Sequence, residues 1–471
     1  MLLQPGARVH MIAICGTAMA SLAGMLRERG FRVTGSDARV YPPMSTLLAE
    51  LGIPLAEGYA AGNLGDCDLV IVGNAVSRGN PELEATLNRR IPYLSLPEVL
   101  RELFLRDRTP VVITGTHGKT TTTALAAYLL ERGGLRPSFL IAGAPRNWDR
   151  PYRLAGGEHF VIEGDEYDSA YYLKIAKFFF YLPHVLVINN IEFDHADIYR
   201  DLAEIQRAFR LLINTVPENG LILANGDDPA VRSLLGGAPA PVQTFGLGDT
   251  HHDLRAIDLQ PGPEGTSFTL EWRGASLGRL RLPLAGRHNV RNGLAALGVG
   301  LWAGLEPDVL QAALGDFRGV RRRLELVGRA RGVTVVDDFA HHPTAVRATL
   351  EALRQVHPRA RLIALFEPAS ATNARAIFEA QYIDAFSAAD LTLIGRVPRP
   401  ERARSDAPFD PERLAAAMRA AGHSAAYLPA VDDMVERVAA MVQPGDVVVI
   451  MSNGAFGGIA ALLLSRLGAQ A

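Results

Sequence analysis

The sequence predicts an α/β fold in three consecutive domains, and three observations support this prediction. The chain has 471 residues, which is enough for about three domains with separate cores. Over residues 111–130 a β-branched run, a glycine turn and an apolar helical pattern follow one another, as in a strand, phosphate-binding loop and helix. Strand and helix patterns alternate on both sides of this segment. We therefore expect a Rossmann-like first domain, a central P-loop-type domain with a mostly parallel sheet and a small antiparallel insertion, and a Rossmann-like third domain.

The composition is that of an ordinary globular protein, with 48% hydrophobic and 21% charged residues. A net charge of −2 favours neither a nucleic acid nor an acidic membrane surface as a partner. Two cysteines, Cys15 and Cys67, cannot form a disulfide framework, and we expect both in the core. Gly16 and Thr17 interrupt the apolar stretch 9–26, so we expect no signal peptide, no membrane span and a cytoplasmic location.

The predicted first domain opens with a strand, a turn, a helix and a second strand. The strand pattern covers 8–14 and the helix pattern covers 18–29, with Gly16 and Thr17 between them and Asp37 after the second strand. In dinucleotide sites the helix start binds phosphate and such an acid binds ribose. The GxGxxG pattern is missing, so we favour a different nucleotide diphosphate over a hydride-transfer cofactor. A purely structural unit remains the alternative.

A further buried strand is expected at 68–73, followed by a polar segment that reaches Asn80 and Pro81. Pro81 suits the first turn of a helix that Asn80 caps, and capping alone would explain Asn80. The charged, proline-broken segment 101–110 indicates a domain boundary. The first domain is therefore expected to cover 1–107.

The central domain begins at the phosphate loop. The full P-loop pattern would require glycine at position 113, where the chain has isoleucine, and the loop reads Gly115-x-x-Gly118-Lys119-Thr120. A plain glycine turn before a helix is the alternative. Only three of the 48 basic residues are lysines, and one of them stands at this loop. We therefore expect the loop amides and Lys119 to bind ATP or GTP, with the Thr120 hydroxyl on Mg²⁺.

Acidic residues follow the next strand patterns of the central domain. Residues 160–162 run into Glu163, the first of four acids in six residues, and residues 185–190 run into a segment that holds His195 among acids. A solvated loop and a surface histidine are the alternatives. The ends of parallel strands converge on one crevice, and hard cations prefer oxygen ligands. We expect these two strand ends to join the Lys119 loop in a metal-phosphate centre.

The remaining segments complete the domain plan. Residues 253–284 alternate between apolar and polar, which predicts the antiparallel insertion. Four arginines lie within 318–323, where they form either a phosphate clamp or a solvated basic face. We place a boundary there, giving a central domain 108–321 and a third domain 322–471. The final turn, 452–458, resembles a phosphate loop without lysine and is expected to contact substrate or to be structural. Third-domain strands are expected at 333–336, 362–366, 391–394 and 447–451, with helices after Pro343, Asn373, Pro411 and Val431.

Six motifs spread over almost the whole chain carry a family resemblance. They are Gly-Thr-His-Gly-Lys-Thr-Thr (115–121), Glu-x-Asp-Glu-x-Asp (163–168), Asn-x-Glu-x-Asp-His (190–195), His-Asn-x-x-Asn (288–292), Val-Arg-Arg-Arg (320–323) and Asp-Asp-x-Ala-His-His-Pro-Thr (337–344). In this order they resemble the Mur ligase family. The resemblance implies an ATP-dependent ligase that forms an amide bond through an acyl phosphate, with Mg²⁺.

Two branches of the family share these motifs. One joins L-alanine to UDP-N-acetylmuramate; the other joins the murein tripeptide L-Ala-γ-D-Glu-meso-diaminopimelate to it, in peptidoglycan recycling. The tripeptide branch is the one that this chain resembles, and L-alanine addition is the alternative. Ala369 and Ala371 stand where the family loop has arginine and asparagine, so the third peptide residue stays open. The segments similar to the tripeptide branch are 41–46, 164–168, 191–199 and 451–459.

The resemblance also implies roles for individual residues. Lys119, Glu163 and His195 would be catalytic, and Thr120, Glu163 and His195 would hold metal. The UDP-sugar would contact Gly16, Thr17, Asp37, Ser77 and Asn80. Division of the sites among the domains implies hinge closure, in a monomer or weak homo-oligomer. The residues expected to bind ATP are Gly115, Thr116, His117, Gly118, Lys119, Thr120, Thr121, Asn289, Asn292, Arg322, Asp338, His341 and His342.

Two functions of other classes compete with ligation. A nucleotide-switch binding protein would form no amide product from ATP and both substrates. A dehydrogenase would bind NAD, which the missing GxGxxG pattern argues against.

Overall fold

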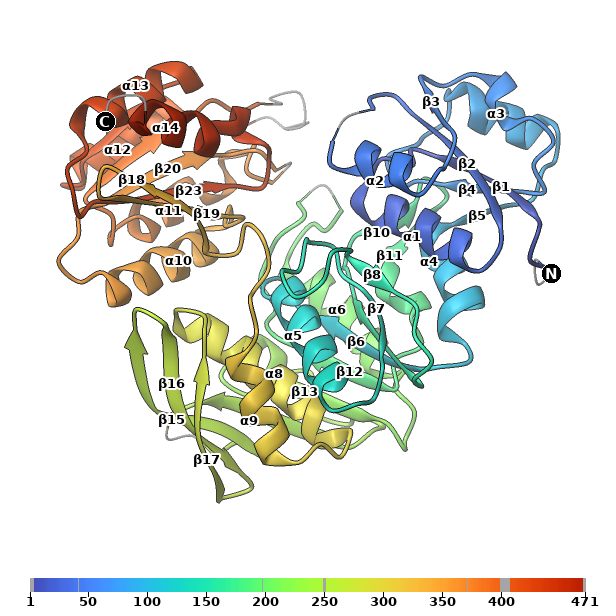
Figure 1. Ribbon diagram of the computed structural model, residues 1–471, viewed down its shortest axis with the longest axis horizontal. Coiled ribbons are helices and arrows are strands. Elements are labelled where there is room, and N and C mark those ends of the chain that lie inside the picture. Colours follow the sequence, from blue (N-terminus) through green and yellow to red (C-terminus); the bar gives the residue numbers. More distant parts are fainter. Residues whose placement is uncertain are drawn as a thin grey trace.

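The computed structural model describes residues 4–40, 42–196, 198–248, 251–370, 372–398 and 407–468. The chain forms a first part in blue, a central part in green and yellow, and a third part in orange and red (Figure 1). Each part is built on its own sheet, and the central part contacts both others (Figure 1). The predicted α/β class is confirmed. The residue limits 1–107, 108–321 and 322–471 remain our proposal for the domains.

The first domain is a parallel sheet in the order β3-β2-β1-β4-β5, as expected for a Rossmann-like unit. Strand β1 lies in the middle of the sheet and is buried except at Arg8, which explains its apolar residues Val9, Met11 and Ile12. The short strands β3 and β5 were not predicted. The elements are β1 (Arg8–Ile12), α1 (Thr17–Glu28), β2 (Arg32–Asp37), α2 (Met44–Glu50), β3 (Leu55–Glu57), β4 (Leu69–Val72), α3 (Pro81–Asn88), β5 (Tyr93–Ser95) and α4 (Leu96–Leu100).

The central sheet has the order β17-β16-β15-β14-β13-β12-β6-β9-β7-β8. Strand β6 lies between β12 and β9 and is parallel to both, with Thr114 opposite Ile188 and Ile113 opposite Glu163. This register places three sequence-distant strand ends side by side. The elements up to β14 are β6 (Thr109–Thr114), α5 (Lys119–Arg132), β7 (Ser138–Leu140), β8 (Tyr152–Arg153), β9 (His159–Glu163), β10 (Asp168–Ala170), β11 (Leu173–Ala176), β12 (Val185–Ile188), α6 (Leu202–Ile213), β13 (Leu221–Asn225), α7 (Pro229–Arg232) and β14 (Val242–Leu247).

The expected antiparallel segment consists of β15 (Leu254–Gly262), β16 (Gly265–Trp272) and β17 (Ala275–Leu282), which pair antiparallel with one another. They are not a separate unit, because β15 also pairs with β14 and so extends the central sheet. Helices α8 (Arg287–Trp302) and α9 (Pro307–Gly315) follow, and α8 packs against α5, the helix after the phosphate loop.

The third domain has the sheet order β18-β19-β23-β20-β21-β22, parallel except for β18. The expected strands and helices are confirmed, and β18 and β22 are additional edge strands. The elements are β18 (Glu325–Ala330), β19 (Val333–Asp338), α10 (Pro343–Val356), β20 (Leu362–Glu367), α11 (Glu379–Ala385), β21 (Leu391–Ile394), α12 (Pro411–Ala420), β22 (Ala425–Tyr427), α13 (Val431–Met441), β23 (Val447–Ser452) and α14 (Ile459–Gly468).

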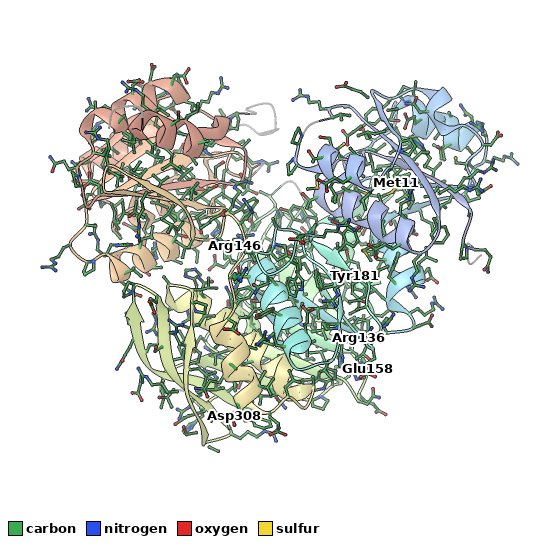
Figure 2. The ribbon with its side chains drawn as sticks, in the orientation of Figure 1. Met11, Arg136, Arg146, Glu158, Tyr181 and Asp308 are labelled. Atoms are coloured by element: carbon green, nitrogen blue, oxygen red, sulfur yellow. The ribbon has the colours of Figure 1, made fainter. Side chains whose placement is uncertain are left out.

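Apolar packing joins the first two domains more closely than it joins the third. One buried cluster contains Met11 from β1 and Tyr181 from the central domain, both labelled in Figure 2. The third domain has clusters of its own on the two faces of its sheet. The segment that leads into it is fixed within the central domain by backbone hydrogen bonds, including Arg146 N to Gly319 O at 2.9 Å. These contacts favour movement of the third domain over movement of the first.

We expect Gly286→Ala to weaken the packing of the third domain. Gly286 has a φ of 94°, and a Cβ there would lie 2.7 Å from Cβ of Ala352 in α10. The strain and the displaced helix should lower the free energy of unfolding by about 1–3 kcal/mol. Thermal unfolding checks this, with Gly236→Ala as the control, because a Cβ at Gly236 would meet nothing within 4 Å. Equal melting temperatures for the two variants would contradict the prediction.

Candidate active site

The phosphate loop connects β6 to α5 and is shaped by its two glycines. Gly115 and Gly118 have φ values of 124° and 83°, which side-chain-bearing residues rarely adopt. A Cβ on Gly118 would lie 2.3 Å from Oδ1 of Asn292, and one on Gly115 would lie 2.9 Å from N of Asn190. The loop therefore fits tightly between the end of β12 and the start of α8. The start of α5 presents free backbone amides, as an anion site requires.

Lys119, Glu166 and His195 form a buried hydrogen-bonded chain. Lys119 Nζ donates to the Glu166 carboxylate at 2.8 Å, and His195 Nε2 lies 2.8 Å from the other carboxylate oxygen. Burial opposes the charge of Glu166, but Lys119 and His195 outweigh burial and lower the pKa of Glu166 to about 2. Burial likewise opposes the charges of Lys119 and His195, and Glu166 raises the pKa of both. Lys119 and Glu166 are therefore both charged at neutral pH.

Glu163 and Thr120 form the neighbouring pair. Thr120 Oγ1 donates to Glu163 at 3.0 Å, and the backbone N of Ala142 donates to its other oxygen at 2.6 Å. Burial, aided by Asp165, raises the pKa of Glu163 to about 7. A buried carboxylate beside a threonine hydroxyl fits a hard divalent cation. These donors therefore suit the Mg²⁺ that the sequence predicts.

The structure brings the three predicted strand ends together. Lys119, Glu163 and His195 all line a single cleft of about 1370 Å³. The cleft also contains residues of the first domain, such as Thr17, and of the third domain, such as Asp338. The expected convergence of the three loops is thus observed, whereas the role of each residue remains a prediction.

Residues of the third domain reach the phosphate loop across the cleft. His342 caps α10, and its ring lies 4.8 Å from the ring of His117, centroid to centroid. His341 Nε2 lies 4.0 Å from Oδ2 of Asp194. Asp338 faces its own domain, where its carboxylate accepts hydrogen bonds from the backbone N of Leu324 and Ala340. Burial raises the pKa of Asp338.

Two adjacent arginines point in different directions. Arg322, the predicted ATP-binding residue, donates from NH2 to the carbonyl oxygens of Ser452 and Gly454 at 2.5 and 2.7 Å, within the third domain. Arg323 instead donates to Thr120 Oγ1 at 3.2 Å. Both residues line the cleft. Among the hydrogen bonds described for these two arginines, only that of Arg323 reaches Thr120, at the end of the phosphate loop.

The two predicted asparagines lie at the start of α8. Asn289 donates to the carbonyl of Ala285 at 2.8 Å and accepts a hydrogen bond from Asn292 at 3.2 Å. Thr116 and Thr121 belong to the phosphate loop and the first turn of α5. Thr121 is buried, and Thr116 Oγ1 accepts a hydrogen bond from the backbone N of Glu192.

The residues predicted for the UDP-sugar lie at the carboxyl edge of the first sheet. Thr17 begins α1 after the exposed Gly16, and Asp37 accepts a hydrogen bond from the backbone N of Cys15 at 2.9 Å. Ser77 is exposed, whereas Asn80 caps α3 by accepting from two backbone N–H groups. Capping therefore explains Asn80 locally. Ala371 lies outside the described residues.

Glu166, Glu192 and Arg323 were not singled out by the sequence prediction. Glu166 and Arg323 stand inside motifs that were recognised, but the spacing of the residues did not reveal which acid or which arginine points into the cleft.

Within the described ranges, no helix combines the length and hydropathy of a membrane crossing.

A phosphate loop, buried acids on the adjacent strand ends and a third domain over the cleft define an enzyme that acts on phosphate groups. Three family models cover most of the chain: Mur ligase family, catalytic domain (8–108); Mur ligase middle domain (113–300); and Mur ligase, glutamate ligase domain (322–454). The chain belongs to the Mur ligase family. It is accordingly an ATP-dependent ligase that forms amide bonds.

Similar proteins cover the chain from end to end. UDP-N-acetylmuramate–L-alanyl-gamma-D-glutamyl-meso-2,6-diaminoheptandioate ligase of Escherichia coli (strain K12) is 42% identical over 98% of this chain and 99% of its own length. The murein peptide ligase of Psychrobacter arcticus matches with a TM-score of 0.75 and 34% identity, over 98% of this chain and 99% of that chain. UDP-N-acetylmuramate–L-alanine ligase of Pelotomaculum thermopropionicum is 35% identical over 95% of this chain and 94% of its own length.

Proposed function

We propose that this enzyme joins the murein tripeptide L-Ala-γ-D-Glu-meso-diaminopimelate to UDP-N-acetylmuramate at the expense of ATP. The meeting of Lys119, Glu163 and His195 in one cleft carries this proposal, because the reaction must bring a carboxylate up to the γ-phosphate. The peptide follows from relatives of 42% and 37% identity that bear this name, against 35–36% for L-alanine ligases. A role in peptidoglycan recycling in the cytoplasm, as a monomer or weak homo-oligomer, is part of the same proposal.

In the proposed first step, an oxygen of the lactyl carboxylate attacks the γ-phosphorus of ATP. The bond to the β,γ-bridging oxygen breaks, giving an acyl phosphate and ADP. Lys119 lies at the loop where the phosphates would bind. Its ammonium, which now donates to Glu166, would donate to a phosphate oxygen instead, so that one anionic partner replaces another. Arg323 belongs to the third domain and contacts Thr120, and from there it would bind phosphate oxygens.

In the proposed second step, the amine of the peptide attacks the activated carbonyl carbon, and inorganic phosphate leaves as the amide forms. The amine loses a proton during this step, and the departing phosphate takes it up. The carboxylate of Glu166, hydrogen-bonded to His195, would lie beside the reacting groups. Closure of the third domain would keep water from the acyl phosphate.

Thr120 and Glu163 would hold one Mg²⁺ and His195 would hold a second, and these ions would supply positive charge that offsets the negative charge of the phosphates. The rest of the predicted ATP-binding and UDP-sugar-binding sets, including Asp37 and Asn289, remain proposals. The residue that recognises the third peptide position is open, because Ala369 offers no donor and Ala371 lies outside the described residues.

We expect the tripeptide to be at least about 100-fold better than L-alanine in kcat/KM, because a site that contacts a long peptide gains binding that alanine cannot supply. Phosphate release with UDP-N-acetylmuramate, ATP and each acceptor measures this, and mass spectrometry of the product identifies the amide. A panel of tripeptides that differ at the third residue then defines that position. Comparable or greater efficiency with L-alanine would assign the chain to L-alanine addition instead.

A further inference from the structure

His117, Glu192 and His342 form a cluster beside the phosphate loop; the two histidines belong to the set proposed to bind ATP, and Glu192 has no part in the proposed steps. His117 belongs to the phosphate loop, Glu192 follows β12, and His342 caps α10 of the third domain. Their potential ligand atoms, Nε2, Oε2 and Nδ1, all lie within 4.8 Å of one another. Three segments from two domains therefore bring two imidazoles and one carboxylate to a single point.

The spacing of these atoms suits a small tetrahedral ion. Glu192 Oε2 lies 3.2 Å from His117 Nε2 and 3.4 Å from His342 Nδ1. Ligands that bind zinc at about 2.0–2.2 Å in tetrahedral geometry are about 3.3 Å apart, because the ligand–ligand distance follows from bond length and angle. Two of the three separations already have this value.

Neighbouring groups orient the ligands as they do in metal sites. His342 Nε2 lies 3.2 Å from the carbonyl oxygen of Phe193; donation of Nε2–H to this oxygen leaves Nδ1 with its lone pair towards Glu192. Glu192 is fixed through its backbone, whose N donates to Thr116 Oγ1 at 2.9 Å. His342 Nδ1 also accepts a hydrogen bond of 3.3 Å from the backbone N of Thr344, which is the contact that a metal ion would replace.

The charge state of the cluster also suits a metal. Burial, reinforced by His117, lowers the pKa of His342 to about 4, so this imidazole is neutral at pH 7 and can act as a ligand. Burial opposes ionisation of Glu192, but contacts with His117 and Thr344 lower its pKa to about 2.

We propose that His117, Glu192 and His342 bind one divalent transition-metal ion of the zinc class. Imidazole nitrogens select such an ion, whereas the oxygen donors of Thr120 and Glu163 select Mg²⁺. His117 and Glu192 line the cleft, so a fourth coordination position can face it. Because two ligands come from the central domain and one from the third, the bound ion holds the third domain against the phosphate loop.

The test measures Zn²⁺ binding to the full-length chain without nucleotide or peptide, by competition with a chromophoric chelator. Cobalt substitution adds a spectroscopic readout, since tetrahedral Co²⁺ absorbs strongly in the visible. His342→Asn removes the ligand but keeps a capping side chain for α10. His117→Gln removes the second imidazole without affecting that cap. The controls are His357→Ala, which removes a histidine just after the same helix, and His195→Ala, which alters the expected Mg²⁺ site.

We expect one Zn²⁺ per chain, with affinity reduced at least about 100-fold and the cobalt band lost in His342→Asn and His117→Gln, since each removes a direct ligand. Both controls should bind Zn²⁺ within about threefold of the unmodified chain. Absence of Zn²⁺ binding in the unmodified chain overturns the proposal. Loss of binding in His195→Ala with retention in His117→Gln also overturns it, because the ion would then occupy the phosphate centre. Neither result bears on ligation, which the product analysis tests separately.

Discussion

Lys119→Ala should abolish ligation while leaving UDP-sugar binding largely intact. The ammonium is buried at the phosphate loop, 2.8 Å from Glu166, and lies where the negative charge of the γ-phosphate would develop. Loss of such a preorganised charge should reduce kcat by at least about 10³-fold. Phosphate release and amide formation measure the loss, and calorimetric titration with UDP-N-acetylmuramate measures binding in the first domain. Near-normal turnover would rule out the proposed phosphate site.

The same substitution removes one partner of a buried ion pair. Glu166 would keep its contact with His195 but lose the ammonium of Lys119, so the free energy of unfolding should fall by about 3 kcal/mol. The double variant Lys119→Ala/Glu166→Gln separates the two effects, because it removes the unpaired charge and should recover stability but not activity. Lys174→Ala is the matched control: Lys174 pairs with Asp168 at the surface and should change neither property.

The meeting of the strand ends could be predicted because it follows from a general property of parallel sheets. Strands β9, β6 and β12 are adjacent and parallel, so Glu163, the phosphate loop and the segment with His195 must leave the sheet at one edge. Each strand was also a short, continuous apolar run, which is the signature of a buried parallel strand. Edge strands such as β3, β5 and β22 lack this signature, being only three residues long.

The direction of individual side chains at the site could not be predicted. Arg322 has a φ of 60° and Leu324 a φ of 51°, and these turns send Arg322 back into the third domain while Arg323 reaches Thr120. Such a segment has no helical or strand periodicity. Its position in the motif therefore could not show which of the two adjacent arginines contacts the phosphate loop. For Asn80 the predicted helix cap is confirmed, because its side chain caps α3. The His117–Glu192–His342 cluster depends on the placement of a whole domain, which spacing along the chain does not encode.

Glu163→Gln should be the next most damaging single change, with kcat reduced by about 10²–10³-fold, the range seen for loss of one electrostatic group in an active site. Glutamine has the shape of glutamate and can still accept one hydrogen bond, so the fold should persist. It lacks the negative charge that a divalent ion requires. The Mg²⁺ concentration for half-maximal rate should therefore rise, and this shift is measured by titrating Mg²⁺ at saturating ATP, UDP-N-acetylmuramate and peptide.

The structure makes this change a sharp test because the carboxylate is held from two sides. Thr120 Oγ1 and the backbone N of Ala142 already donate to its two oxygens, and burial raises the pKa of Glu163 to about 7. A carboxylate so placed is costly to ionise without a cation, so an amide there should be tolerated or even favourable for stability. Glu163→Gln should thus unfold at the same or a higher temperature while losing activity. Glu158→Gln, at the exposed residue just before β9, should leave both the unfolding temperature and the activity unchanged. A Glu163→Gln enzyme with an unaltered Mg²⁺ requirement would remove Glu163 from the metal site.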